Sequence, residues 1–165
     1  MNYALYVGRF QPIHWGHVKV IQSMIKDGYN PIIVVGSSQE VKSEKNPLDI
    51  TTRIELLTDL MAYIKPNKFH IIPLSDISVD ADWVPYVLNN VKFITGHTPT
   101  VFYGGDEVAL SLFKEAGMVS KKIDRVALEI SATMVRDYIK KEDCQWKVYI
   151  PSPIHDKVYN AFFRE

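Results

Sequence analysis

The segment from Gly8 to His17 reads Gly-Arg-Phe-Gln-Pro-Ile-His-Trp-Gly-His and brings together groups that bind anions. His14 and His17 are three positions apart, so both imidazoles can project from one face at the start of a helix. Gly16 lets a phosphate approach the backbone, and the forked cation of Arg9 suits phosphate oxygens. This segment therefore predicts a turn that binds phosphate.

Two common phosphate-binding motifs are missing from the chain. It contains neither the G-x-G-x-x-G of dinucleotide-binding folds nor the G-x-x-x-x-G-K-[ST] of P-loops. A histidine pair at this spacing also arises by accident, as one surface and one core side chain. A metal site would need a third ligand that the sequence does not identify. The neighbouring elements must decide between these interpretations.

Two short apolar runs flank the turn, and each ends at a glycine. Residues 3–7 precede Gly8 and residues 31–35 precede Gly36, a pattern typical of buried parallel strands. Between them, apolar residues recur at helical spacing over positions 18–25 and stop at an Asp-Gly pair. The order strand, turn, helix, strand predicts a right-handed βαβ unit.

The same alternation continues to the end of the chain. Further strands are expected at 69–74, 100–103 and 126–128, and further helices at 51–61, 83–91, 108–113 and 131–140, the last capped by Ser131 or Thr133. Residues 146–163, within a helical C-terminal segment at about 143–165, are expected to form a closing helix that packs on the sheet or meets a neighbouring subunit. We therefore predict a single domain with a doubly wound, open parallel α/β sheet and a ligand site at the carboxyl ends of the strands.

Composition limits the class of protein. The 165 residues are 47% hydrophobic, which suits one domain with a real core, and 19 basic residues balance 19 acidic ones, which disfavours nucleic acid as a partner. No apolar run reaches the roughly 18 residues of a membrane span, and the N-terminus lacks a signal-peptide pattern, so we expect a soluble cytoplasmic protein. The single cysteine, Cys144, cannot form an internal disulfide and fits a reducing compartment.

The string from Gly8 to His17 resembles the H-x-G-H signature of a nucleotidyltransferase superfamily with a Rossmann-like, HUP-type fold. In its full form, Gly-Arg-Phe-Gln-Pro-x-His-x-Gly-His, it is similar to nicotinamide-nucleotide adenylyltransferases of the archaeal and bifunctional type. The resemblance implies catalytic roles for Arg9, His14, His17 and Arg136. It implies that ATP is bound by Gly8, Arg9, Phe10, His14, Gly16, His17, Gly105, Asp106, Ser131, Thr133 and Arg136.

Turns after the other strands resemble the same family. They are Gly-Ser-Ser-Gln at 36–39, Asn-Pro at 46–47 followed by Arg-Ile at 53–54, and the segment 76–83, which is similar to Asp-Ile-x-x-Asn-x-x-Trp around the nicotinamide. A tryptophan face can stack on a cationic pyridinium, which nearby carboxylates also favour. The resemblance implies that the nicotinamide nucleotide is bound by Ser37, Ser38, Asn46, Arg53, Asp76, Asp80 and Trp83, with Asp82 close by.

Two further motifs complete the resemblance, which extends to about residue 139. Gly-Gly-Asp at 104–106 is similar to the turn against the adenosine, and Ser-x-Thr-x-x-Arg at 131–136 is similar to the motif that holds the β- and γ-phosphates of ATP. Asp80 and Asp106 stand where the family often has asparagine, and Asp137 stands where some relatives carry a second arginine. A doubled arginine contact is therefore not expected.

Each of these residues also has a structural interpretation. Arg53 can be a solvated charge on a helix, and Trp83 can be a core or interface aromatic. The Ser-x-Thr-x-x-Arg string alone is only a helix cap followed by a charged residue. Its place after the last expected strand is what favours a binding role.

The resemblance implies joining of nicotinamide mononucleotide and ATP to give NAD and pyrophosphate. Mg²⁺ would enter with ATP, since the chain shows no dedicated carboxylate cage and we expect no protein-bound metal site. A homo-oligomer is expected by resemblance, and no Nudix hydrolase box follows residue 140. Two alternatives remain: another H-x-G-H enzyme, such as pantetheine-phosphate adenylyltransferase, or a domain that senses NAD or ATP without turnover.

Overall fold

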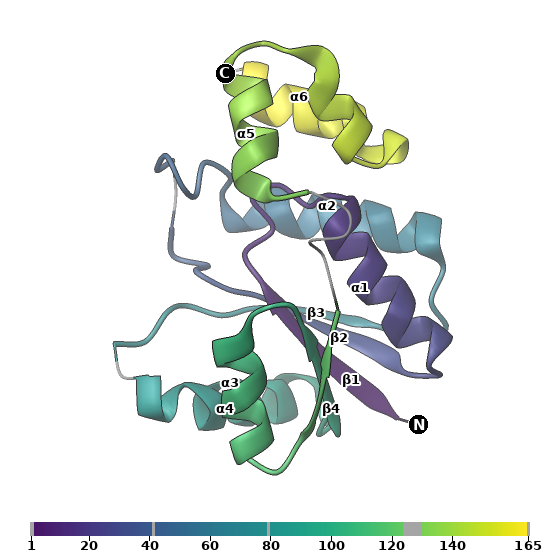
Figure 1. The fold of residues 1–165 in the computed structure, drawn as a ribbon, viewed down its shortest axis with the longest axis vertical. Helices are drawn as coiled ribbons and strands as arrows, with labels where there is room; N and C mark the ends of the chain where they lie inside the picture. The colour runs from purple at the N-terminus through teal and green to yellow at the C-terminus, as the bar shows by residue number, and fades with distance from the viewer. Residues whose placement is uncertain (1, 41, 79, 124–129, 165) are drawn as a thin grey trace.

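We describe the fold from a computed structural model, which covers residues 2–40, 42–78, 80–123 and 130–164. Five strands form one parallel sheet in the order β3-β2-β1-β4-β5 (Figure 1). They are β1 (Tyr3–Gly8), β2 (Asn30–Val35), β3 (His70–Pro73), β4 (Val101–Gly104) and β5 (Val119–Lys122). The chain winds outward from β1 in both directions, which confirms the doubly wound α/β sheet and creates a switch point between β1 and β4.

Helices cover both faces of the sheet (Figure 1). One face carries α1 (Trp15–Lys26) and α2 (Ile50–Ile64), and the other carries α3 (Trp83–Thr95) and α4 (Glu107–Glu115). Alternate residues of β1 supply the two layers: Ala4 and Tyr6 belong to the core cluster with α1 and α2, and Leu5 belongs to the cluster with α3 and α4. A strand buried on both faces explains why the 3–7 run is uniformly apolar.

The helices expected before residue 141 are confirmed, with small shifts at their ends. Helix α2 begins at Ile50 because the Asp49 carboxylate accepts a hydrogen bond from the Thr52 N–H at 2.8 Å. Helix α3 tolerates Pro85 in its first turn, where a missing N–H costs nothing. Helix α5 (Ala132–Lys140) is capped by Ser131, whose hydroxyl accepts from the Met134 N–H at 3.1 Å.

The expectation for the last strand needs revision. The segment 126–128 lies outside the described residues, whereas β5 at Val119–Lys122 was not expected. Its sequence, Val-Ser-Lys-Lys, lacks the apolar run of a buried strand. It lies at the edge of the sheet, paired to β4, and Val119 is exposed. An edge strand needs few apolar residues, and its lysines discourage pairing with another chain.

The prediction of a single closing helix over 146–163 is wrong. Residues Cys144–Tyr149 and Ser152–Ile154 form 3-10 turns, and α6 runs over His155–Phe163. Pro151 and Pro153 cause the interruption, since proline supplies no N–H and restricts the residue before it. Side chains from this segment join the core cluster of α2 and α5, so it covers these helices at one end of the molecule instead of the sheet (Figure 1): they are Trp146, Ile150, Ile154 and Val158.

Two other features of the described residues concern membrane-spanning helices and the cysteine. None of their helices has the length and apolar character needed to cross a bilayer. Cys144 is exposed and has a free thiol, outside the sites described below.

Candidate functional site

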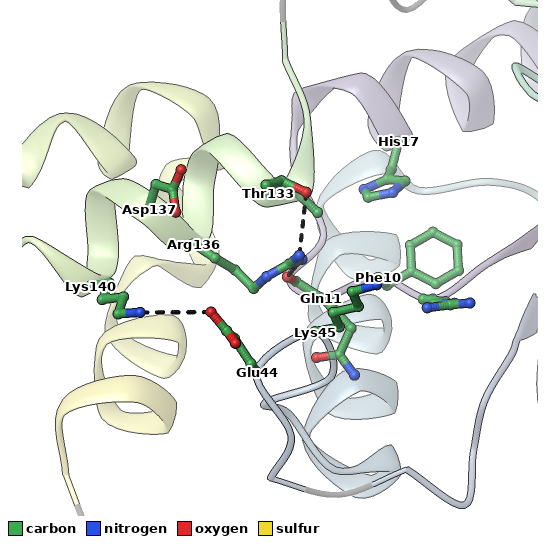
Figure 2. Close-up of a pocket in the computed structure, with 11 residues that line it drawn as sticks. Phe10, Gln11, His17, Glu44, Lys45, Thr133, Arg136, Asp137 and Lys140 are labelled. Carbon is green, nitrogen blue, oxygen red and sulfur yellow. Dashed lines mark hydrogen bonds and ion pairs between the residues drawn. The ribbon is translucent and has the colours of Figure 1, made fainter.

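Two pockets open at the carboxyl ends of the strands, on either side of Arg9. The first, the α5 pocket, has a volume of about 660 Å³ and lies between the first turn, the 44–45 loop and α5 (Figure 2). Its walls are Arg9, Phe10, Gln11, His17, Glu44, Lys45, Ala132, Thr133, Arg136, Asp137 and Lys140. The second, the strand-end pocket, has a volume of about 740 Å³ and lies beside the switch point. Its walls include Gly8, Arg9, Gly36, Ser37, Asp76, Trp83, Gly104, Gly105 and Asp106.

The two histidines cap α1 reciprocally. His14 is the N-cap residue, and its Nδ1 accepts a hydrogen bond from the Gly16 N–H at 3.0 Å. The His14 N–H donates in turn to Nδ1 of His17 at 3.1 Å, and the two rings stack with centroids 3.8 Å apart. An Nδ1 that accepts a backbone N–H carries no proton, so each neutral ring holds its hydrogen on Nε2. The backbone thus fixes the tautomer of both rings.

The surroundings of the histidines are buried. His14 is 2% exposed and His17 is 6% exposed, and His17 lines the α5 pocket. The ring of Phe10 packs against His17 at 4.7 Å. A side chain at Gly8 would come within 2.9 Å of that ring, so Gly8 leaves the space that Phe10 occupies. Phe10 therefore supports the ring of His17. The Gly16 N–H is already used, because it donates to His14 in the cap of α1.

Helix α5 is joined to the first turn through Arg136. Its Nη1 donates to the Gln11 carbonyl at 2.9 Å and its Nη2 donates to the Thr133 hydroxyl at 3.4 Å. Burial lowers the pKa of Arg136 from its usual value, and the adjacent Asp137 opposes that shift. Thr133 and Arg136 line the α5 pocket, whereas the Ser131 hydroxyl is engaged in capping α5. The Ser-x-Thr-x-x-Arg string is therefore both a helix cap and a pocket wall.

The α5 pocket contains charges that motif comparison missed. Lys45 and Lys140 line it together with Arg9 and Arg136, against the carboxylates of Glu44 and Asp137. Lys140 and Glu44 form an exposed ion pair at 3.8 Å, which contributes little. Figure 2 shows His17, Lys45 and Arg136 on three different segments around the same space. In the sequence, the position of Lys45 directly before Asn-Pro at 46–47 was the signal that could have identified it as a pocket residue.

Arg53 has a different environment from the one expected. It is fully buried and is not among the described residues that line either pocket. Its guanidinium donates to backbone carbonyls of Arg9 at 3.1 Å, Gly36 at 2.8 Å and Ser37 at 3.1 Å, and its Nε donates to that of Asp49 at 3.3 Å. Burial lowers its pKa, which Asp49 partly opposes. Arg53 thus ties the ends of β1 and β2 together beneath the site.

A hydrogen-bonded group joins the turns after β2 and β3. The Asp76 carboxylate accepts from the Ser37 hydroxyl at 2.9 Å and from the Gln39 side-chain amide at 3.0 Å. The Asp76 N–H donates to Gln39 Oε1 at 3.1 Å, so the pair is reciprocal. Ser38 and Ser75 meet at 3.4 Å on the exposed side. These contacts hold Asp76 and Ser37 at the strand-end pocket.

The other expected residues fall into two groups. Trp83 lines the strand-end pocket and packs edge to face on Phe113, with the ring centroids 5.4 Å apart; Gly105 and Asp106 line the same pocket. Asp106 also caps α4, where its carboxylate accepts from the Val108 N–H at 3.3 Å. Asn46 is buried, lines neither pocket among the described residues, and has an Oδ1 with no hydrogen-bond partner there.

Two acidic residues follow in the 3-10 turn Asp80–Asp82. The side chain of Asp80 lies outside the description, and Asp82 makes no side-chain cap for α3. Across the described ranges, no group of three or more His, Cys, Asp or Glu side chains is placed to hold a metal ion.

Residues 5–152 match the model of the cytidylyltransferase-like family. A nicotinamide-nucleotide adenylyltransferase from Pyrobaculum aerophilum is 35% identical over 157 residues, covering 93% of this chain and 85% of that protein. The protein of the same name from Pyrococcus furiosus is 32% identical over 169 residues, covering 96% and 83%.

Solved structures show the same fold. The bifunctional NMN adenylyltransferase/ADP ribose pyrophosphatase from Francisella tularensis, complexed with AMP and a Mn ion, is similar with a TM-score of 0.74 and 20% identity. That match covers 90% of this chain but 44% of the other, so this chain spans less than half of the bifunctional protein. A Plasmodium falciparum nicotinic acid mononucleotide adenylyltransferase complexed with NaAD has a TM-score of 0.68 and 18% identity, covering 99% of both chains. From the sequence matches, the chain belongs to the cytidylyltransferase-like family and, within it, to the nicotinamide-nucleotide adenylyltransferases.

Proposed function

We propose that this protein joins nicotinamide mononucleotide to ATP. An oxygen of the 5′-phosphate of the mononucleotide attacks the α-phosphorus of ATP in line. The bond from that phosphorus to the bridging α,β-oxygen breaks, pyrophosphate leaves, and NAD forms. The observation that carries this proposal is the pair of pockets that share Arg9, one rich in cations and one walled by Trp83 and Asp76.

Membership of the nicotinamide-nucleotide adenylyltransferases makes the chain a nucleotidyltransferase of NAD synthesis. The reaction needs no nucleophile from the protein, because the attacking phosphate is already anionic. Catalysis then consists of holding two anions in line and stabilising the charge on the α-phosphate and the leaving pyrophosphate. The α5 pocket, which is lined by four cationic side chains, suits that task.

In this proposal His17 donates from Nε2 to an α-phosphate oxygen as charge develops there. Reciprocal capping fixes its tautomer and orientation before substrate arrives, so little reorganisation is needed. Arg9, Lys45 and Arg136 bind the remaining phosphate oxygens. His14 supports this arrangement through the cap and the ring stack.

In this proposal the nicotinamide ring binds in the strand-end pocket. A cationic pyridinium is favoured by the face of Trp83 and by the carboxylate of Asp76. Trp83 is already fixed by Phe113, and Asp76 by Ser37. Arg9, between the pockets, is positioned for the phosphates that the two substrates contribute to the new bond.

A divalent cation is proposed to enter with ATP as part of the substrate. Mg²⁺ would bridge phosphate oxygens and water and neutralise part of the triphosphate charge. The Francisella structure is complexed with Mn, which supports the use of a divalent ion. The carboxylates that line the α5 pocket are Glu44 and Asp137.

The test is to incubate the protein with Mg²⁺, ATP and nicotinamide mononucleotide and to measure NAD and pyrophosphate, which should appear in equal amounts. Phosphopantetheine in place of the mononucleotide serves as the control substrate. Product formed from phosphopantetheine alone would identify a pantetheine-phosphate adenylyltransferase. Tight NAD binding without turnover would identify a sensor.

A further inference from the structure

Gln11 makes a clamp between two segments that are distant in sequence. Its side chain is 2% exposed, its Nε2 donates to the Leu48 carbonyl at 2.9 Å, and its Oε1 accepts from the Leu48 N–H at 2.9 Å. The amide therefore pairs with both backbone groups of one residue, Leu48, in the way a neighbouring strand would. Two good hydrogen bonds in a buried setting fix both distance and orientation.

The clamp holds the loop that forms one wall of the α5 pocket. Ser43 and Asn46 close a tight turn, in which the Ser43 N–H donates to the Asn46 carbonyl at 3.2 Å and the Asn46 N–H donates to the Ser43 hydroxyl at 3.0 Å. Glu44 and Lys45 lie within that turn and line the pocket. Leu48 follows directly, so the Gln11 contact sets the position of the turn relative to the first turn of the chain.

The backbone of Gln11 contacts the opposite wall. Its carbonyl accepts from Arg136 of α5 at 2.9 Å. One residue thus joins the loop of Lys45, the α5 wall and the segment that ends in the histidine pair. Gln11 therefore links the three segments that carry Arg9, Lys45 and Arg136.

We propose that the Gln11 side chain is a positioning residue, which places Lys45 for binding the ATP phosphates without contacting them through its own amide. This inference rests on the proposed function. It assigns a role to a residue whose side-chain amide is engaged at both its nitrogen and its oxygen with the backbone of Leu48, and it predicts an effect confined to ATP.

The first experiment replaces Gln11 with methionine, which keeps the length of the side chain and removes both hydrogen bonds. The KM for ATP should rise about tenfold, while the KM for nicotinamide mononucleotide should stay within about twofold, because the strand-end pocket does not depend on the loop. Tyr103→Phe is the matched control. It removes a buried hydroxyl that donates to Asp27 at 2.5 Å, away from both pockets, and should leave both KM values unchanged.

A double-mutant cycle then separates positioning from a general loss of structure. If Gln11 acts through Lys45, Gln11→Met should raise the KM for ATP by less than about twofold in a Lys45→Ala background. Equal effects in both backgrounds, or equal increases in both KM values, would overturn the proposal. NAD formation by the unsubstituted protein is measured first, so that failure of the proposed function is recognised separately.

A measurement on the unsubstituted protein covers the case in which Gln11→Met does not fold. Hydrogen exchange at the Leu48 amide should be slow in the free protein, since that N–H is held by Gln11. ATP should slow it further and nicotinamide mononucleotide alone should not, because ATP binding stabilises the clamped loop. Exchange at Leu48 that does not respond to ATP would contradict the inference.

Discussion

At the scale of single residues, the site depends on side chains whose freedom has been removed. The Nδ1 of His17 accepts a hydrogen bond from the His14 N–H, which fixes the orientation of the ring and places the proton of the neutral ring on Nε2. Arg136 is held at Gln11, and Asp76 is held at Ser37. Groups fixed in this way stabilise a transition state better than mobile ones, because they do not have to be ordered during the reaction.

His17→Ala should lower kcat far more than it raises KM for either substrate, by about 100-fold to 1000-fold, as for loss of one donor to a developing oxyanion. Steady-state kinetics with each substrate varied will measure the split. Trp15→Ala is a neighbouring control that leaves both caps in place. A His17→Ala enzyme with unchanged kcat would remove His17 from the catalytic step.

Arg53→Lys distinguishes a structural arginine from one that binds substrate. Lysine keeps the charge but cannot reach the carbonyls of Arg9, Gly36 and Ser37 together, so the free energy of unfolding should fall by about 1–3 kcal/mol. Urea denaturation measures this loss. A selective rise in the KM for nicotinamide mononucleotide with unchanged stability would instead restore Arg53 as a direct ligand.

At the scale of secondary structure, the site is built where helices begin. Helix α1 is capped by the histidine pair, α2 by Asp49, and α5 by Ser131, and all three begin at the carboxyl side of the sheet. The positive ends of the α1 and α5 dipoles favour an anionic ligand there. Each cap accepts a hydrogen bond from an N–H group in the first turn of its helix and so fixes the direction in which the helix starts.

Asp49→Ala should lower the free energy of unfolding by about 1 kcal/mol at pH 7 through loss of the α2 cap. The bond from Thr52 holds the pKa of Asp49 below the 3.8 of an ordinary aspartate. A depressed folded-state pKa gives stability that is present above the unfolded value and is lost as pH falls through the folded one. The difference between the two proteins should therefore shrink below about pH 4 in urea titrations, and a difference that grows on acidification would contradict this sign.

At the scale of the whole molecule, a net charge of zero conceals an uneven distribution. The α5 pocket carries four cationic side chains and two carboxylates, whereas the strand-end pocket carries Arg9 with Asp76 and Asp106. The doubly wound topology makes this possible, because it brings the ends of β1, β2 and β4 to one edge. The C-terminal segment covers α2 and α5.

Ile154→Ala tests whether that C-terminal cover is one cooperative unit with the sheet. Ile154 is fully buried in the core cluster that includes α2, so the substitution should lower the free energy of unfolding by about 2–5 kcal/mol. Fluorescence and far-UV circular dichroism should still report a single transition, with KM values unchanged below it. Two separate transitions would show that the cover unfolds independently.

The sequence by itself determined the alternation of elements and the first turn. Glycine-ended apolar runs specify β1 and β2 locally, and helical periodicity specifies α1 and α2. The edge strand β5 and the broken C-terminal segment escaped prediction. Pairing with β4 stabilises β5 despite its polar sequence, and two prolines outweigh the helical pattern after residue 146.

Only the tertiary structure decided how the motif residues are used. The spacing of Gly8, His14 and His17 indicated phosphate, but reciprocal capping, the support from Phe10 and the burial of Arg53 depend on contacts across the fold. The contact between Gln11 and Leu48, which are 37 positions apart, joins the loop that carries Lys45 to the first turn. Local pattern fixes which elements form, whereas hydrogen-bond partners at long sequence distance are chosen by packing, which no single segment encodes.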